Sequence, residues 1–276
     1  MIHGSALQDL GKVKHSSLSA SFKLTHVCFL IPIQILLAAN SFGFIITNMK
    51  SVKLLKGTQA ALAKYGVPIN SRERTMHVGI ELMRKNSVAQ WNKLRQQFEN
   101  VAGVYGAKDV VSAQNAIALF FGPKQTHDVS QSSAECSQRS ALCLIKPHAI
   151  AEGKAANIVK RLQQDCEITA IEQVQLTKED GSEFLECYKE VLGEYRATLA
   201  EMTSGPMIAV EVCDDDSVAQ LRKIAGPYIV EIARALAPNS IRAKFGNSDL
   251  ENAVHVTDLV IDGKLECNFF FRVLKT

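Results

Sequence analysis

One histidine in this sequence stands in a pattern that suits the transfer of phosphoryl groups. His255 lies within the stretch Asn252-Ala-Val-His-Val-Thr-Asp258. A neutral imidazole is a nucleophile near pH 7, and a covalent relay can move a phosphoryl group between two acceptors without losing it to water. Because phosphates carry several negative charges, such a site also needs cations. A single histidine after an apolar pair is otherwise most often a core or turn residue.

The elements that must position this histidine form a regular series over the second half of the chain. Apolar runs predict buried strands, helical spacing of apolar side chains predicts helices, and Thr177 with Asp180 forms a capping-box pattern. In chain order we expect strands over 141–146, 168–176, 207–213 and 265–271, and helices over 155–164, from 177 to 191 and from Ser217 to Gly226. This βαββαβ order predicts the ferredoxin-like split βαβ sandwich of the α/β (α+β) class, an antiparallel four-stranded sheet with helices.

The chain also contains an internal repeat. The sequence NSVAQWNKL at 86–94 recurs as DSVAQLRKI at 216–224, and FIITNMKSVKL at 44–54 matches CEITAIEQVQL at 166–176. Later matches lie further apart, so the first copy is the shorter one. We predict an N-terminal segment of uncertain structure over 1–39, a truncated unit over 40–122, a linker over 123–140 and a complete unit over 141–276. The truncated unit lacks an opening strand and an Asn-x-x-His segment, and we expect no phosphotransfer from it.

The composition indicates a globular chain of a reducing, cytoplasmic compartment. Of 276 residues, 21% are charged and 47% hydrophobic, which excludes wholesale disorder and a multi-span membrane protein. The net charge of +3 is too small to indicate nucleic-acid binding, and the seven cysteines form no C-x-x-C pair. The apolar segment 27–39 is shorter than the roughly 20 residues that span a bilayer. We therefore expect a buried helix there, with a membrane anchor as the weaker alternative.

Four motifs of the second unit together resemble the nucleoside diphosphate kinase family. They occur in family order and are Lys146-Pro147, Ser204-Gly205-Pro206, Ile241-Arg242 and the stretch around His255. The tandem arrangement and the His-x-Thr-Asp sequence are similar to the axonemal type of this family. The resemblance implies reversible transfer of the γ-phosphate of ATP to nucleoside diphosphates through a phosphohistidine. It also implies Mg²⁺ as cofactor, carried by the nucleotide phosphates and not by protein ligands.

The resemblance implies a role for each matched residue. His255 is the nucleophile, Glu266 orients its ring and Tyr188 lies beside it. The nucleotide is bound by Lys146, Arg222 and Arg242 on the phosphates, by Asn252 on the ribose, and by Tyr195, the aromatic nearest to the family's base-stacking position. A guanidinium offers phosphate a bidentate fork, whereas a lysine acts as a point charge.

Each assignment has a structural alternative, and three residues depart from the family pattern. The cations can be ordinary surface charges, Tyr188 a core aromatic, and Glu266 the outward residue of an alternating strand. Val256, Tyr228 and Glu251 stand where family members have glycine, threonine and arginine. We expect Val256 to crowd the histidine and lower activity. His148, two residues beyond Lys146, is expected to be solvated.

Two functions remain open at this stage. The matched site residues favour an enzyme that binds ATP and nucleoside diphosphates. The three substitutions and the incomplete first unit favour a weak or inactive kinase-like scaffold on ciliary or centrosomal microtubules. Neither function requires nucleic acid or a membrane.

Overall fold

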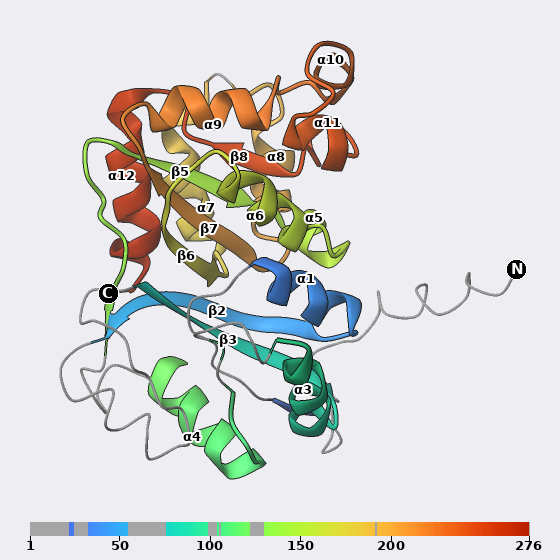
Figure 1. Cartoon of the computed structure of the whole chain (residues 1–276). Helices are drawn as coiled ribbons and strands as arrows, with labels where there is room; N and C mark the ends of the chain where they lie inside the picture. The colour runs from blue at the N-terminus through green and yellow to red at the C-terminus, as the bar shows by residue number, and fades with distance from the viewer. Residues whose placement is uncertain are drawn as a thin grey trace, which may run out of the picture.

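The computed structural model describes residues 22–24, 33–54, 76–98, 104, 106–121, 130–190 and 192–275. One antiparallel sheet runs through them (Figure 1) in the order β1-β3-β2-β6-β7-β5-β8, with β4 paired to β2. The strands are β1 (Phe22–Leu24), β2 (Ile45–Leu54), β3 (Met76–Lys85), β4 (Ser130–Ser132), β5 (Ser140–Ile145), β6 (Ile168–Val174), β7 (Met207–Cys213) and β8 (Val254–Val256). The sheet thus continues across both halves of the sequence.

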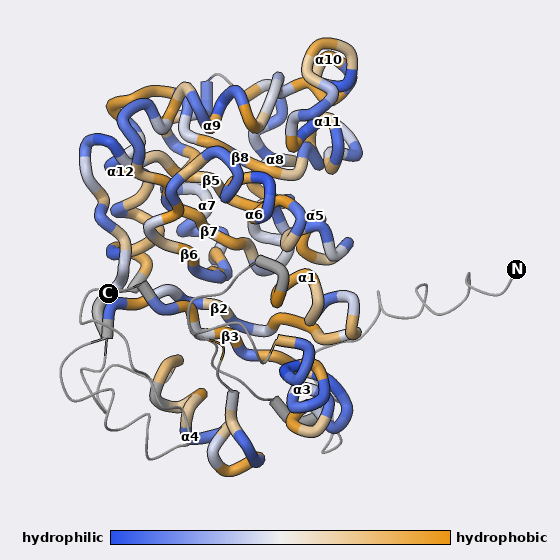
Figure 2. Tube along the Cα trace, in the orientation of Figure 1, coloured by the Kyte–Doolittle hydropathy of each residue, from blue (hydrophilic) through white to orange (hydrophobic). Residues whose placement is uncertain are grey.

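Helices cover both faces of the sheet. The helices are α1 (Ile33–Ser41), α3 (Ser87–Arg95), α4 (Val110–Phe121), α5 (Pro147–Ala151), α6 (Ala155–Gln163), α7 (Lys178–Leu185), α8 (Tyr195–Met202), α9 (Ser217–Ala225), α10 (Val230–Leu236), α11 (Ile241–Phe245) and α12 (Val260–Phe271), with short 3-10 turns η2 (Gln96–Phe98), η3 (Glu186–Tyr188) and η4 (Val273–Lys275). One apolar core lies beneath α1, α3, α6 and α9, and a second beneath α7, α8 and α12. In Figure 2 hydrophobic colour follows the central strands, whereas the helices mix both colours.

The second half has the predicted split βαβ fold. Its strands lie in the order β6-β7-β5-β8, with every neighbouring pair antiparallel. Three of the four strands are where the apolar runs placed them; β5 ends at Ile145, one residue before Lys146. The capping box of Thr177 and Asp180 opens α7 as predicted. Helix α9 begins at Ser217 as predicted, with Asp216 as its N-cap residue, and the Ser217 hydroxyl accepts a hydrogen bond from the Asp214 amide.

The prediction of a strand over 265–271 is wrong, because these residues belong to α12. The buried residues of this helix are Gly263, Glu266, Cys267, Phe270 and Phe271, which is the i, i+3, i+4, i+7 spacing of one helical face. Gly263 is required by the close approach of the helix to β5, since a Cβ there would lie 2.1 Å from the Ser140 carbonyl oxygen. The fourth strand is instead the three-residue β8, which contains His255 itself.

Among the described residues, the first half repeats the three strands and places α1 between β1 and β2 and α3 after β3. Helices α3 and α9 begin at Ser87 and Ser217, the positions that the internal sequence match aligns. The expectation of a missing opening strand is corrected by β1, which pairs with β3. Between α3 and α4 the described residues contain no counterpart of α10, α11 or β8. The division into a truncated unit over 40–122, a linker and a complete unit stays a prediction.

The two halves meet at an approximate twofold axis. Strand β2 pairs antiparallel with β6 through Lys50 and Glu172, which are equivalent positions of the repeat. An antiparallel pair of equivalent residues is the arrangement that a twofold axis produces. Beside this pair the Ile171 amide donates a 2.8 Å hydrogen bond to the buried Ser51 hydroxyl.

The apolar N-terminal segment is described only from residue 33 onward. There it forms α1, which packs beside α6 (Figure 1) and buries Ile35, Leu36 and Ala39. This agrees with the expected buried helix, while 27–32 lie outside the described residues. Within the described part of the chain, no helix combines the length and the apolar character needed to cross a bilayer.

Candidate active site

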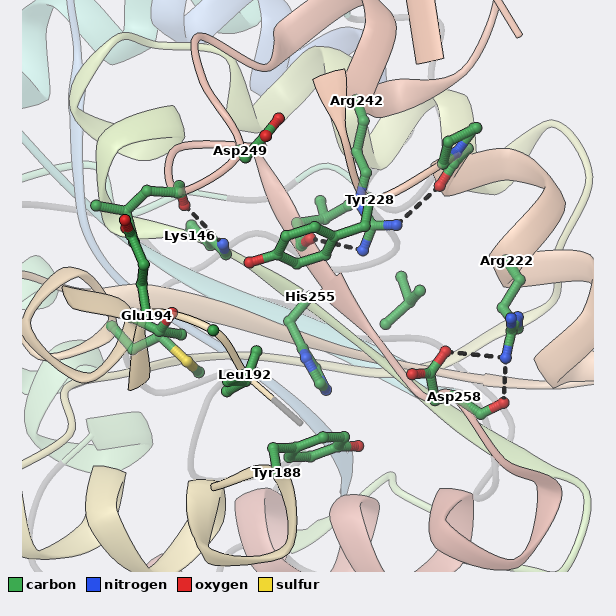
Figure 3. A pocket seen from close by; sticks show the side chains of 18 of the residues that line it. Lys146, Tyr188, Leu192, Glu194, Arg222, Tyr228, Arg242, Asp249, His255 and Asp258 are labelled. Atoms are coloured by element: carbon green, nitrogen blue, oxygen red, sulfur yellow. Dashed lines mark hydrogen bonds and ion pairs between the residues drawn. The ribbon is translucent and has the colours of Figure 1, made fainter. Parts of the chain in front are cut away.

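A pocket of about 930 Å³ opens beside β8. This volume lies in the range of ligand sites, roughly 300 to 1,000 Å³. Its wall brings together five of the predicted site residues, each from a different part of the fold: Lys146, Tyr188, Arg222, Arg242 and His255. Figure 3 shows these side chains facing one space, with Arg222 and Asp258 at one side and Lys146 and Glu194 at the other.

His255 is held by a carboxylate behind the pocket wall. Its Nε2 lies 3.2 Å from Glu266 Oε1, and only 17% of its side chain is exposed. Because the carboxylate accepts, Nε2 carries a proton and Nδ1 keeps a lone pair for the pocket. The rings of Phe184 and Tyr188 contact the imidazole edge-on, at centroid distances of 5.3 and 5.5 Å. The nucleophile predicted from the sequence therefore has a fixed orientation.

The Glu266 carboxylate accepts two further hydrogen bonds. The Tyr188 hydroxyl donates at 2.6 Å and the Thr257 hydroxyl at 2.5 Å. Burial by itself raises the pKa of the Glu266 carboxyl, but His255 and these hydrogen bonds hold that pKa below its ordinary value. Burial and the neighbouring Glu266 charge raise the pKa of the Tyr188 hydroxyl, which therefore stays a donor. Since Glu266 lies on α12, its alternative role as an outward strand residue is excluded.

Lys146 is a buried cation at the N-terminus of α5. Only 3% of the residue is exposed, and its ammonium donates a 2.9 Å hydrogen bond to the Leu250 carbonyl. Burial, with a smaller contribution from Arg242, lowers the pKa of Lys146 to about 8. An ordinary solvated lysine at the end of a strand is therefore excluded.

The two arginines differ in how far they are free to move. Arg242 is 8% exposed and donates to the carbonyls of Gly226 at 2.8 Å and of Val254 at 3.2 Å, so it ties β8 to the turn after α9. Arg222 is half exposed and donates to the main-chain and side-chain oxygens of Asp258, at 2.7 and 2.9 Å. Arg242 is thus part of the pocket's framework, whereas Arg222 is a rim residue that can exchange partners.

Besides Glu266, two predicted residues do not line the pocket. Asn252 is fully buried behind it and donates to the Tyr228 carbonyl at 3.3 Å. Tyr195 shares a hydrogen bond with Ser182 and is not among the residues of the pocket wall. Its place in base binding stays a prediction that the geometry does not support.

The three departures from the family pattern have different consequences. Val256 follows His255 on β8, belongs to the core cluster beneath α6 and α9 and also lines the pocket; the expected crowding of the histidine stays a prediction. Tyr228 lies in the pocket, with its ring 5.6 Å from the Arg242 guanidinium. Glu251 bonds to Asn247 in the loop before β8. Tyr228 and Val256 therefore line the space open to a ligand, whereas Glu251 does not.

The structure corrects the expected exposure of His148 and shows contacts of Glu201 and Thr257 that the sequence analysis did not predict. His148 was expected to be solvated, but it is buried against Glu201, 53 residues away in sequence. No sequence signal joins this pair. Thr257, which donates to Glu266, could have been found, since it lies in the motif two residues after His255. In the part of the chain that the structure describes, no three His, Cys, Asp or Glu side chains gather as metal ligands.

Comparisons with known proteins identify the family. A sequence model described as "Nucleoside diphosphate kinase" matches residues 139–275. The nucleoside diphosphate kinase of Aquifex aeolicus is 33% identical over 135 residues, which cover 49% of this chain and 94% of that protein. This chain belongs to the nucleoside diphosphate kinase family. The resemblance of its four motifs to that family is thereby confirmed.

Similarity to other kinase homologues extends over both halves. "Nucleoside diphosphate kinase homolog 7" of Rattus norvegicus is 29% identical over 270 residues, covering 87% of this chain and 68% of that protein. A crystal structure of the Aquifex aeolicus kinase covers 50% of this chain and 97% of its own, with 32% identity and a TM-score of 0.47. The rodent match therefore includes residues outside the range of the family model.

Proposed function

We propose that this chain transfers the γ-phosphate of ATP to nucleoside diphosphates through a phosphohistidine on His255. The observation that carries the proposal is the bond from His255 Nε2 to Glu266, which leaves Nδ1 as the nitrogen available to a pocket walled by Lys146, Arg222 and Arg242. One imidazole nitrogen with a lone pair, opposite several cations, is what in-line attack on a phosphoryl group requires.

The reaction balances with groups of this chain and two nucleotides. The Nδ1 lone pair attacks the γ-phosphorus while the bond to the bridging oxygen breaks, and ADP leaves with that electron pair. The imidazole then carries a positive charge, and its Nε2 proton stays against Glu266, which Thr257 and Tyr188 keep ionised. In the second step of the reaction, a β-phosphate oxygen of a nucleoside diphosphate attacks the phosphorus and the nitrogen–phosphorus bond breaks.

Phosphate groups would find unused hydrogen-bonding capacity here. Arg242 Nε, a donor, is buried and has no hydrogen-bond partner among the described residues. Buried polar atoms without partners are uncommon and often belong to binding sites. Mg²⁺ keeps its waters and is often held by substrate phosphates, so the ion would arrive with the nucleotide. Such an ion supplies charge neutralisation on the phosphates.

Labelling with γ-³²P ATP tests the proposal. Wild-type protein is expected to take up label that survives alkali and is lost in acid, and His255→Gln is expected to take up none. Glu266→Gln is expected to slow labelling by at least about tenfold, because the ring loses its orientation. Asp262→Asn, which changes a half-buried carboxylate one turn earlier on α12, is the matched control and is expected to have a much smaller effect, because Asp262 makes no hydrogen bond to His255. Label that persists in His255→Gln contradicts the assignment.

The alternative function is a kinase-like scaffold that binds ciliary or centrosomal microtubules from the cytoplasm. One observation favours it: the Tyr228 ring lies against Arg242, whose two amino groups are already bonded to carbonyls. A wild-type protein that binds ATP weakly and takes no label, yet sediments with microtubules, supports this alternative. Replacing Tyr228 with Thr, the family residue, then tests whether the ring is what blocks phosphate.

A further inference from the structure

A second histidine is buried beside the pocket and has no part in the mechanism above. His148 lies on α5 and Glu201 on α8, and their side chains are only 7% and 10% exposed. His148 Nδ1 is 2.5 Å from Glu201 Oε1. Because the carboxylate accepts this bond, Nδ1 carries the proton and Nε2 is left as an acceptor.

The acceptor nitrogen of His148 is used on the backbone that leads to β8. The Ala253 amide donates to His148 Nε2 at 3.2 Å, and the Lys146 amide donates to the Ala253 carbonyl at 3.0 Å. Both peptide groups of this fully buried alanine are therefore fixed by the segment that begins α5.

Ala253 needs this support because its backbone is strained. Its φ is 73°, in the left-handed region that residues with a Cβ rarely occupy. Such conformations persist where surrounding contacts over-determine them, and they often lie at functional sites. Ala253 joins Asn252 to the three-residue strand β8, in which His255 is the central residue. The direction in which β8 starts therefore depends on Ala253.

We propose that the His148–Glu201 pair is a positioning device for the nucleophile. Glu201 fixes the tautomer of His148, and His148 Nε2 holds Ala253 in the left-handed conformation that aims His255 into the pocket. The two residues are positioning residues and touch neither the nucleotide nor the transferred group. The kinetic test of this inference rests on the proposed phosphotransfer, whereas its structural test does not.

Two amide variants separate the two bonds that His148 makes. In His148→Asn the side-chain amide takes the place of Nδ1 and can donate to Glu201, but it cannot reach Ala253. In His148→Gln the longer side chain brings an oxygen to the place of Nε2, where it can accept from the Ala253 amide. We expect His148→Asn to lower the rate of His255 phosphorylation at saturating ATP about tenfold, the upper effect of one lost hydrogen bond. We expect His148→Gln to stay within about threefold, and the half-saturating ATP concentration to change little in both variants.

Amide exchange in the full chain supplies a readout that does not depend on activity. In His148→Asn the Ala253 amide is expected to exchange at least about tenfold faster than in wild type, while Ala209 in the central strand β7 keeps its protection. In wild type, nitrogen NMR is expected to show the Nδ1-protonated tautomer of His148. Equal behaviour of the two variants, or a parallel loss of protection at Ala253 and Ala209, would overturn the inference, the latter because it indicates a general role in stability. A wild type that takes no label refutes the proposed function, and the exchange of Ala253 and the tautomer of His148 then decide the positioning inference alone.

Discussion

The buried ammonium of Lys146 makes nucleotide binding depend on pH in a predictable way. With a pKa of about 8 in the nucleotide-free protein, Lys146 loses its proton within the range where the protein can be studied. A triphosphate brings several negative charges beside it, so the bound form holds the proton more tightly. Binding is therefore coupled to proton uptake above pH 8, and each further pH unit is expected to raise Kd by up to about tenfold, or 1.4 kcal/mol.

Titration calorimetry with a non-hydrolysable ATP analogue measures this effect. Between pH 7 and pH 9 the Kd of wild type is expected to rise about tenfold, because the protonated fraction of Lys146 falls from about nine tenths to one tenth. Near pH 8 about half a proton should be taken up per nucleotide, as measured in buffers of different ionisation enthalpy. Lys146→Arg keeps its charge at every pH and Lys146→Gln has none, so both variants should lack the pH-dependent component and together correct for other titrations. A wild-type Kd that changes no more than that of Lys146→Arg refutes the reasoning.

Three further changes test how the fold supports the site. Gly263→Ala is expected to destabilise the chain by at least 1 to 3 kcal/mol in urea unfolding, because its Cβ would collide with the Ser140 carbonyl, whereas Gly193→Ala, which has open space, should be nearly neutral. Glu211→Gln is expected to cost about 1 to 3 kcal/mol and to expose the chain near residue 136 to proteases, because both carboxylate oxygens of this fully buried residue accept main-chain amides, from Glu135 and Cys136; unchanged proteolysis contradicts this. Ser51→Val is expected to lower the free energy of unfolding by a similar amount, because the Ile171 amide loses its acceptor. An unaltered unfolding midpoint would show that this contact between the halves contributes nothing to stability.

Local sequence patterns predicted most strands and helices of the second half. They failed where an apolar run typical of a strand coincides with helical spacing of the buried residues. Apolar runs placed β5, β6 and β7, and Thr177 placed the start of α7. The run Leu265–Phe271 was assigned to a strand because it is apolar and short, although its buried residues have helical spacing. Leu259, Val260, Ile261 and Leu265 are exposed apolar residues that obscure this spacing. The exposed apolar residues of α12 therefore explain why the sequence pattern did not predict this helix.

The site was predictable as a set of residue types but not as a set of contacts. The order of the motifs predicted that Lys146, Arg242 and His255 share one site, and all three line the pocket. The same motifs do not predict the hydrogen-bond partners of each side chain within the folded protein. Arg242 bonds to carbonyls 12 and 16 residues away, and His148 bonds to Glu201 and Ala253, contacts that only the folded backbone creates. These are the contacts that fix the pocket's geometry.

The pocket and the first half lie on opposite sides of the four strands of the second half. The pocket lies beside β8, at one edge of the sheet, whereas the first half adjoins β6 on the other side of β7 and β5. What the first half contributes there is β2, Ser51 and α1, all of which pack at or near the twofold axis. Elements α10, α11 and β8, for which the described residues between α3 and α4 contain no counterpart, lie in the second half on the side away from β6. The first half instead supplies β2, which pairs with β6 at Lys50 and Glu172 and so shields an edge that could otherwise pair with other chains.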